Sequence, residues 1–63
     1  QAATFLTLAC DAGDAFGCSQ LGEAYFTGTG VAVDRARGMT LFERGCSGGD
    51  NWACRRRKEL RVP

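Results

Sequence analysis

The 63-residue chain contains no histidine, a single lysine (Lys58) and a single methionine (Met39). Without histidine the chain lacks the commonest general base, so neither a Ser-His-Asp nor a Cys-His catalytic arrangement can form within it. Zinc-dependent hydrolysis loses its usual ligand for the same reason. Neither Ser19 nor Ser47 is followed three residues later by a lysine, so the Ser-x-x-Lys pattern of β-lactamases is missing too. The sequence therefore predicts no catalytic residues, no cofactor and no metal site.

Long hydrophobic runs are missing as well. No apolar run in the sequence approaches the roughly 20 residues of a membrane span, and no basic segment followed by an apolar one marks a signal peptide. We therefore expect no membrane insertion. Because the chain starts at Gln1 without an initiator Met, we expect it to be processed, excised or truncated, so the missing signal does not indicate a cytoplasmic protein.

Neither sign of charge is in large excess. Eight basic residues stand against seven acidic ones, which gives a formal net charge of +1. Such a chain has no overall field to attract nucleic acid or an anionic membrane, and we expect no nucleic-acid partner. With 44% hydrophobic residues, the composition is that of a globular protein.

Cysteine, in contrast, is abundant, with four residues in this short length. A chain of this size buries only about 60% of the surface that its unfolded form exposes. Small domains usually supplement such a core with disulfides, a metal or a partner. Because disulfides form in oxidising compartments, we expect an extracytoplasmic protein, secreted or periplasmic.

An internal repeat appears when the chain is compared with itself at an offset of 36 residues. The offset superimposes both pairs of cysteines and both glycine-aspartate turns: Cys10 on Cys46, Cys18 on Cys54, and residues 13–14 on 49–50. It also places Thr4 on Thr40 and Glu23 on Glu59. Because the cysteines and the turn fall in one register, these matches indicate a structural repeat.

The local pattern is helical throughout. Apolar residues at three-and-four spacing predict helices over residues 1–12, 15–27, 34–46 and 51–61. Gly13 suits the left-handed position that ends a helix, and Asp14 offers its carboxylate to the free amides of the next helix. The same pair recurs at residues 49–50, so we expect two tight helical hairpins. The expected buried stripe of the second helix consists of Gly17, Cys18, Leu21, Ala24, Tyr25 and Gly28.

The spacing of the cysteines predicts their pairing. Four cysteines permit three connectivities, but the members of each pair are equidistant from the aspartate of their turn. They therefore lie one helical turn from the bend on facing helices, where a Cα separation of about 4.4 to 6.8 Å suits a disulfide. We expect disulfides between Cys10 and Cys18 and between Cys46 and Cys54, each contributing on the order of 2.5 kcal/mol. Free buried thiols and a four-cysteine zinc site are the alternatives, and the second is disfavoured because zinc ligands usually stand two to four residues apart.

One segment resembles a known family through Leu21, Gly22, Tyr25, Gly28, Gly30, Val31, Asp34 and Phe42. This run is similar to the Sel1-like repeat, a relative of the tetratricopeptide repeat. The Cys-x7-Cys pairs at a 36-residue period resemble its cysteine-rich bacterial branch, the Helicobacter cysteine-rich proteins and their relatives. The sequence departs from the motif at Gly38 and Gly45, where small alanines are usual.

The resemblance implies an all-α fold, a right-handed α/α superhelix (solenoid) of antiparallel helix pairs with one disulfide in each repeat. Residues 1–12 would then be the second helix of a preceding repeat, residues 13–48 one complete repeat, and residues 49–63 the first helix of a terminal, capping repeat. Arg57 and Lys58 stand where the complete repeat has Leu21 and Gly22, which suggests that the array ends there, because a terminal repeat needs a polar outer face.

The same resemblance implies a protein-binding scaffold without catalytic activity, whose partner is another protein or a neighbouring subunit of a complex. Solenoids bind along their concave surface, and the first helix of each unit is expected to line it. The predicted partner-binding residues are Ser19, Gln20, Glu23, Phe26 and Thr27. The alternative is a binder or hydrolase of small molecules or cell-wall fragments (β-lactam-like) that uses residues outside this chain.

Two further features have two interpretations each. The equivalent aromatics Phe16 and Trp52 are expected to pack against the adjacent repeat, with anchoring of a partner as the alternative. The basic run from Arg55 to Lys58 is expected to be the solvated face of a terminal helix. Its alternative role is to bind phosphate, an acidic polymer or an acidic partner.

Overall fold

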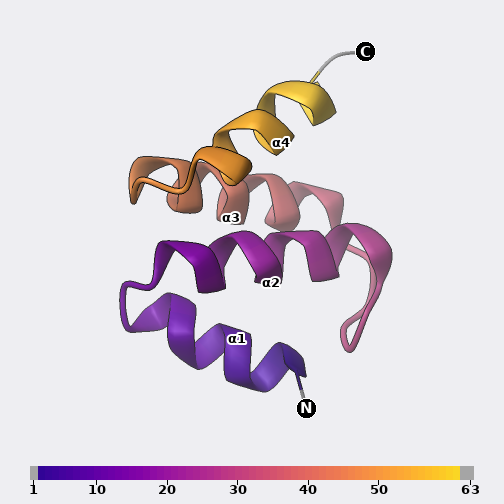
Figure 1. Ribbon diagram of the computed structural model, residues 1–63. Coiled ribbons are helices and arrows are strands. Elements are labelled where there is room, and N and C mark those ends of the chain that lie inside the picture. The colour runs from indigo at the N-terminus through magenta and orange to yellow at the C-terminus, as the bar shows by residue number, and fades with distance from the viewer. Residues whose placement is uncertain (1, 62–63) are drawn as a thin grey trace.

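The computed structural model describes the backbone of residues 2–61 and the side chains of residues 4–60. It contains the helices α1 (Ala2–Asp11), α2 (Ala15–Thr27), α3 (Arg35–Ser47) and α4 (Asn51–Arg61), and residues 2–61 form no strand. Consecutive helices lie side by side and run antiparallel (Figure 1), in a flat body of 31 × 24 × 13 Å. The chain is therefore all-α, and the four helices expected from the sequence are present to within a residue or so at each end.

The two hairpins, α1–α2 and α3–α4, are closed by the same hydrogen bonds. In each turn the glycine amide donates to the carbonyl oxygen of the cysteine three residues earlier, and the aspartate amide donates to the carbonyl oxygen five residues earlier. All four bonds measure 3.0 Å and join Gly13 to Cys10, Asp14 to Ala9, Gly49 to Cys46, and Asp50 to Gly45. The two glycines have φ angles of 96° and 102°, in the region that glycine adopts without a Cβ penalty. The chain therefore makes the same turn twice.

Three helices begin at an aspartate whose carboxylate accepts a backbone N–H. The pairs, each with an N···O distance of 3.1 Å, are Asp14 with Phe16, Asp34 with Arg37, and Asp50 with Trp52. Such caps satisfy an amide that the helix itself leaves free and typically contribute about 1 kcal/mol. The capping roles expected of Asp14 and Asp50 are thereby confirmed.

Both hairpins are joined by a disulfide near the turn. Cys10 is bonded to Cys18 and Cys46 to Cys54, with Cα–Cα distances of 4.4 Å and 4.6 Å, and none of the four cysteines is free. This is the pairing that the sequence predicts. The first disulfide lies deep in the molecule, where Cys10 and Cys18 are 1% and 4% exposed and contact Leu21 and Leu41, whereas the second is half-buried.

The closest contact between hairpins is made by α2 and α3, through glycines. A Cβ atom placed on Gly22 would lie 2.9 Å from the carbonyl oxygen of Gly38, a distance that real side chains do not tolerate. The two helix backbones therefore touch at this point. Gly38, which the sequence comparison marked as a departure from alanine, is one of the positions that make this approach possible.

The buried face of the second helix differs in part from the expected stripe. Gly17, Cys18, Leu21 and Ala24 are buried as expected. Tyr25 is only half-buried and Gly28 is exposed, whereas Ser19 and Gly22 are buried as well. The reason is that α2 is central and contacts α1, α3 and α4, whereas a single apolar stripe accounts for one neighbour only.

Within the described part of the chain, every helix is too short or too polar to traverse a bilayer.

Candidate partner-binding surface

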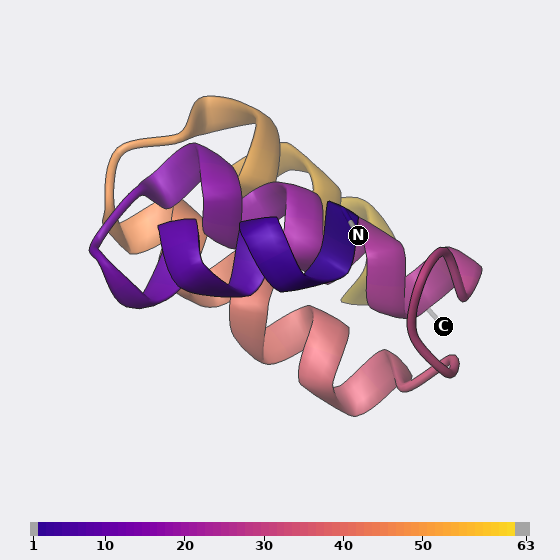
Figure 2. The same ribbon diagram turned by 90° about the horizontal axis from the view of Figure 1, so that it is seen from below.

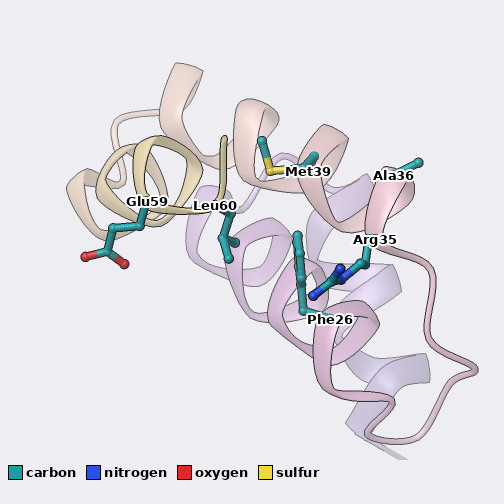
Figure 3. A pocket seen from close by; sticks show the side chains of 6 residues that line it. All are labelled: Phe26, Arg35, Ala36, Met39, Glu59 and Leu60. Atoms are coloured by element: carbon teal, nitrogen blue, oxygen red, sulfur yellow. The ribbon is translucent and has the colours of Figure 1, made fainter. Parts of the chain in front are cut away.

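Each hairpin has a hollow at its open end, opposite the disulfide. The first hollow has a volume of about 230 Å³ and is lined by Leu6, Gln20, Glu23, Ala24, Thr27 and Thr29. The second hollow has a volume of about 420 Å³ and is lined by Phe26, Arg35, Ala36, Met39, Glu59 and Leu60 (Figure 3). The 36-residue offset carries Glu23 and Ala24 onto Glu59 and Leu60, so the two hollows share two equivalent lining positions at the open ends of their hairpins.

The hollows exist because the helices of each hairpin diverge away from their turn (Figure 1). Near the first disulfide the helices are close, since a Cβ on Gly17 would lie 2.8 Å from the Cβ of Ala9. The view from below likewise shows α3 and α4 separating beyond the turn that joins them (Figure 2). The disulfide and the small residues thus fix one end of each hairpin and leave the other end open.

Apolar side chains form the walls of the second hollow. The ring of Phe26 packs on the ring of Phe42 at a centroid distance of 5.7 Å, and it lies so close to Gly38 that a Cβ there would come within 2.7 Å of it. Phe26, Met39 and Leu60 come from three different helices and extend toward a common space (Figure 3). All three are half-buried, so part of each side chain remains available to a ligand.

Arg56 connects α4 to α2 beside these walls. Its Nη2 donates to Glu23 Oε1 at 3.0 Å and its Nη1 donates to Glu59 Oε1 at 3.2 Å. Its guanidinium carbon lies 6.0 Å from the ring centroids of both Phe42 and Trp52, within the range of cation–π attraction. The hydrogen bond to Glu23, followed by the one to Glu59, raises the pKa of Arg56 above its ordinary value, so the residue stays charged.

These contacts correct the prediction for the basic run. Arg55 and Lys58 are exposed as expected of a solvated face, but Arg56 and Arg57 are half-buried. Arg56 contacts two carboxylates and two aromatic rings, and only 26% of its side chain is exposed. The sequence did not reveal this because Glu23 is 33 residues away along the chain.

Ser19 was wrongly predicted to be a contact residue. It is 0% exposed, and its hydroxyl donates to the carbonyl oxygen of Ala15 at 3.0 Å. The physical reason is the position of α3, which covers this side of α2 at Gly45. A hydroxyl that is satisfied within its own helix needs no solvent.

The other four predicted contact residues lie at the hollows. Gln20, Glu23 and Thr27 line the first hollow, and Phe26 lines the second. Their role in binding a partner remains a prediction. Glu23 is the least available of them, because its carboxylate is paired with Arg56.

The equivalent aromatics Phe16 and Trp52 have different surroundings. Trp52 packs edge-on against Phe42, with ring centroids 5.7 Å apart and an interplanar angle of 70°, as the packing interpretation expects. Phe16 is 61% exposed. The smaller Leu6 stands in α1 where Phe42 stands in α3, so Phe16 has no ring to pack against.

Basic residues are confined to the second half of the chain, a feature of the sequence that the prediction from net charge missed. All eight basic residues follow residue 34, and the first 34 residues contain four carboxylates and no base. The net charge of +1 conceals this asymmetry, which a count over each half of the chain would have found. Since α1 and α2 line the first hollow while α3 and α4 supply most of the second, the two equivalent hollows differ in their electrostatic surroundings.

An exposed apolar face on α1 was not foreseen either. Phe5 and Leu8 are 70% and 64% exposed. Leu41, the residue that the offset places on Phe5, is only 6% exposed, because α2 packs against α3. Phe5 thus corresponds to a covered position in the second hairpin, whereas Leu8 corresponds to the exposed Arg44.

Among the residues that the structure describes, no three His, Cys, Asp or Glu side chains lie together in a way that would hold a metal ion. Comparison with models of protein families, with curated protein sequences and with solved structures finds no match to this chain.

Proposed function

We propose that this chain belongs to a repeat protein that binds other proteins, and that it has no catalytic activity of its own. The observation that carries the proposal is the pair of hollows at the open ends of two equivalent hairpins. Each combines apolar walls with polar side chains at its edge, the composition that protein interfaces favour. Three of the four helices within residues 2–61 contribute to the second hollow, so a ligand bound there would contact α2, α3 and α4 together.

The proposed architecture is an α/α superhelix of Sel1-like repeats. This proposal is supported by the two turns, which lie 36 residues apart and have the same hydrogen bonds, caps and disulfides. Such recurrence is typical of stacked repeat units. The exposed face of α1 supports it too. In a longer array a further helix would cover Phe5 as α2 covers Leu41.

The proposed compartment is extracytoplasmic and oxidising. Two disulfides in so short a chain support this, because such bonds are rare where glutathione and thioredoxin keep thiols reduced. One of the two lies in the main apolar cluster, so an oxidised cysteine pair forms part of the core.

Site-specific photo-cross-linking in the native source tests the proposed function. A photoreactive residue at Gln20, at the rim of the first hollow, is compared with one at Thr40, an exposed position on α3 outside both hollows. We expect a defined protein to be captured from position 20 and not from position 40, and to bind the purified chain. Capture from position 40 alone, or from neither position, would contradict the proposal.

A further inference from the structure

We propose that the second hollow binds an acidic peptide segment with an apolar anchor: Phe26, Met39 and Leu60 contact the anchor, and Arg35 pairs with a carboxylate beside it. The inference rests on the proposed function and names the chemistry of the partner. It follows from the contrast between two hollows that are equivalent in position but different in charge.

Arg35 provides the positive charge at the rim. Its guanidinium extends from α3 to lie beside Phe26 (Figure 3), and no ion pair within residues 4–60 engages it. The carboxylate of its neighbour Asp34 accepts the amide of Arg37. Arg35 is therefore a cation available to a carboxylate from outside, and a planar guanidinium can bind such a group through two hydrogen bonds.

The one carboxylate that lines the second hollow does not oppose an acidic ligand strongly. Glu59 accepts from Arg56 Nη1, and its side chain points away from the other five lining residues (Figure 3). Arg56 thus offsets part of the charge of Glu59, and it shares its own charge with Glu23. Residues 34–63, which supply most of this hollow, contain eight basic and four acidic side chains, so this part of the chain carries a net positive charge.

The apolar walls favour a peptide over a nucleic acid. Phe26, Met39 and Leu60 are half-buried side chains from three helices, and an apolar anchor placed between them would remove their remaining surface from water. The volume of about 420 Å³ lies in the range of about 300–1,000 Å³ that ligand sites occupy. A phosphate polymer would use the basic side chains and leave these walls uncovered.

The first hollow serves as the internal comparison. It is lined by Glu23 and by uncharged residues, and it contains no basic side chain. An acidic segment therefore finds no counter-charge in its lining, so the preference for acidic peptides belongs to the second hollow alone.

Titrations with synthetic hexapeptides test this inference. The probe is fluorescein-labelled Glu-Glu-Leu-Phe-Glu-Glu, and its controls are Lys-Lys-Leu-Phe-Lys-Lys, which reverses the charge, and Glu-Glu-Ser-Gly-Glu-Glu, which removes the anchor. A labelled thymidine oligonucleotide represents the polyanion. Fluorescence anisotropy gives each affinity, and amide chemical shifts of the ¹⁵N-labelled chain locate each site.

We expect the acidic probe to bind at the second hollow and more tightly than all three controls. Arg35→Glu should weaken its binding at least about fivefold, because an attraction is replaced by a repulsion. Arg44→Glu makes the same change of charge on α3 at a position outside both hollows, and it should change the affinity less than about twofold.

Three outcomes would overturn the inference. They are equal or tighter binding of the lysine peptide at the second hollow, tighter binding of the oligonucleotide, and no binding of the acidic probe. The first would leave the proposed function intact, since a peptide would still occupy the site. The cross-links from position 20 decide the proposed function separately.

Discussion

At the scale of single residues, the contact between α2 and α3 depends on glycines, which have no side chain. Gly22 and Gly38 let two helix backbones touch, and a Cβ on Gly22 would come within 2.9 Å of a carbonyl oxygen. Backbone cannot move aside as a flexible side chain can, so relief would require the helices to separate.

We therefore expect Gly22→Ala to destabilise the chain by about 1 kcal/mol, even though alanine is the better helix former by about the same amount. Thermal unfolding followed by circular dichroism should show a midpoint lowered by about 4–8 °C. Thr40→Ala, at an exposed position of α3, is the matched control and should leave the midpoint unchanged or raise it. A midpoint for Gly22→Ala equal to or above that of the unmodified chain would refute the close contact.

Arg56 links α4 in the second hairpin to α2 in the first. Its pair with Glu23 is only partly exposed, with 26% and 34% of the two side chains accessible. Water and salt still screen such a pair, so its contribution is modest.

A double-mutant cycle with Glu23→Gln and Arg56→Gln should give a coupling energy of about 0.5–1 kcal/mol. The coupling should shrink as salt is added. Glu43→Gln in place of Glu23→Gln provides the control, because Glu43 is an exposed residue of α3 with no ion pair to Arg56, and its effect should add to that of Arg56→Gln. Additivity in both cycles would show that Arg56 does not connect α2 to α4.

At the scale of the helical hairpin, the two disulfides close loops of equal length but lie in different surroundings. Closing this loop contributes about 2.5 kcal/mol to the stability of the chain for each disulfide. Cys10 and Cys18 are nearly inaccessible, whereas Cys46 and Cys54 are half-buried. A serine hydroxyl at a buried position adds a desolvation penalty of about 1–3 kcal/mol unless it finds a partner.

The variant Cys10→Ser/Cys18→Ser should therefore be less stable than Cys46→Ser/Cys54→Ser. Chemical denaturation measures the free energy of unfolding of the two double variants. Each variant loses the closure of a nine-residue loop, about 2.5 kcal/mol, so any difference between them reflects the different burial of the two disulfides. Equal stability of the two variants would mean that burial of the first disulfide adds nothing to loop closure.

The hairpins were also the level at which the sequence was most informative. Glycine and aspartate in the turns have specific local roles, so Gly13 and Asp14 predicted both the bend and the cap. The buried face of α2 was predicted less well. Ser19 is buried by α3, a neighbour whose position depends on packing between hairpins and is not encoded in the period of one helix.

At the scale of the whole molecule, the chain is thin and has a small core. Its shortest dimension is 13 Å, little more than the diameter of one helix. A domain of this size rarely has more than about 3–5 kcal/mol of stability from its core alone, which is comparable to what two disulfides contribute together, about 5 kcal/mol.

Reduction of both disulfides should accordingly unfold most of the chain at 25 °C. Far-ultraviolet circular dichroism with and without a phosphine reductant measures this, and the helical signal should fall as free thiols appear. A reduced chain that retains its helical signal and unfolds cooperatively would show that the core is sufficient without the disulfides.

The candidate site was predicted in part. Helical spacing brought Gln20, Glu23 and Thr27 to one side of α2, and they line the first hollow. The second hollow was not foreseen, because it joins Phe26 to residues of α3 and α4 and so depends on tertiary packing. The separation of basic from acidic residues along the chain could have been predicted from the sequence, but the net charge of the whole chain does not reveal it.

A crystal structure of the chain bound to the protein captured from position 20 is the decisive measurement. We expect the partner to occupy a hollow at the open end of a hairpin, in contact with Gln20 and Thr27 or with Met39 and Leu60. A partner bound to the exposed side of α3 around Thr40, with both hollows open to solvent, would contradict the proposal that the open ends of the hairpins form the binding surface.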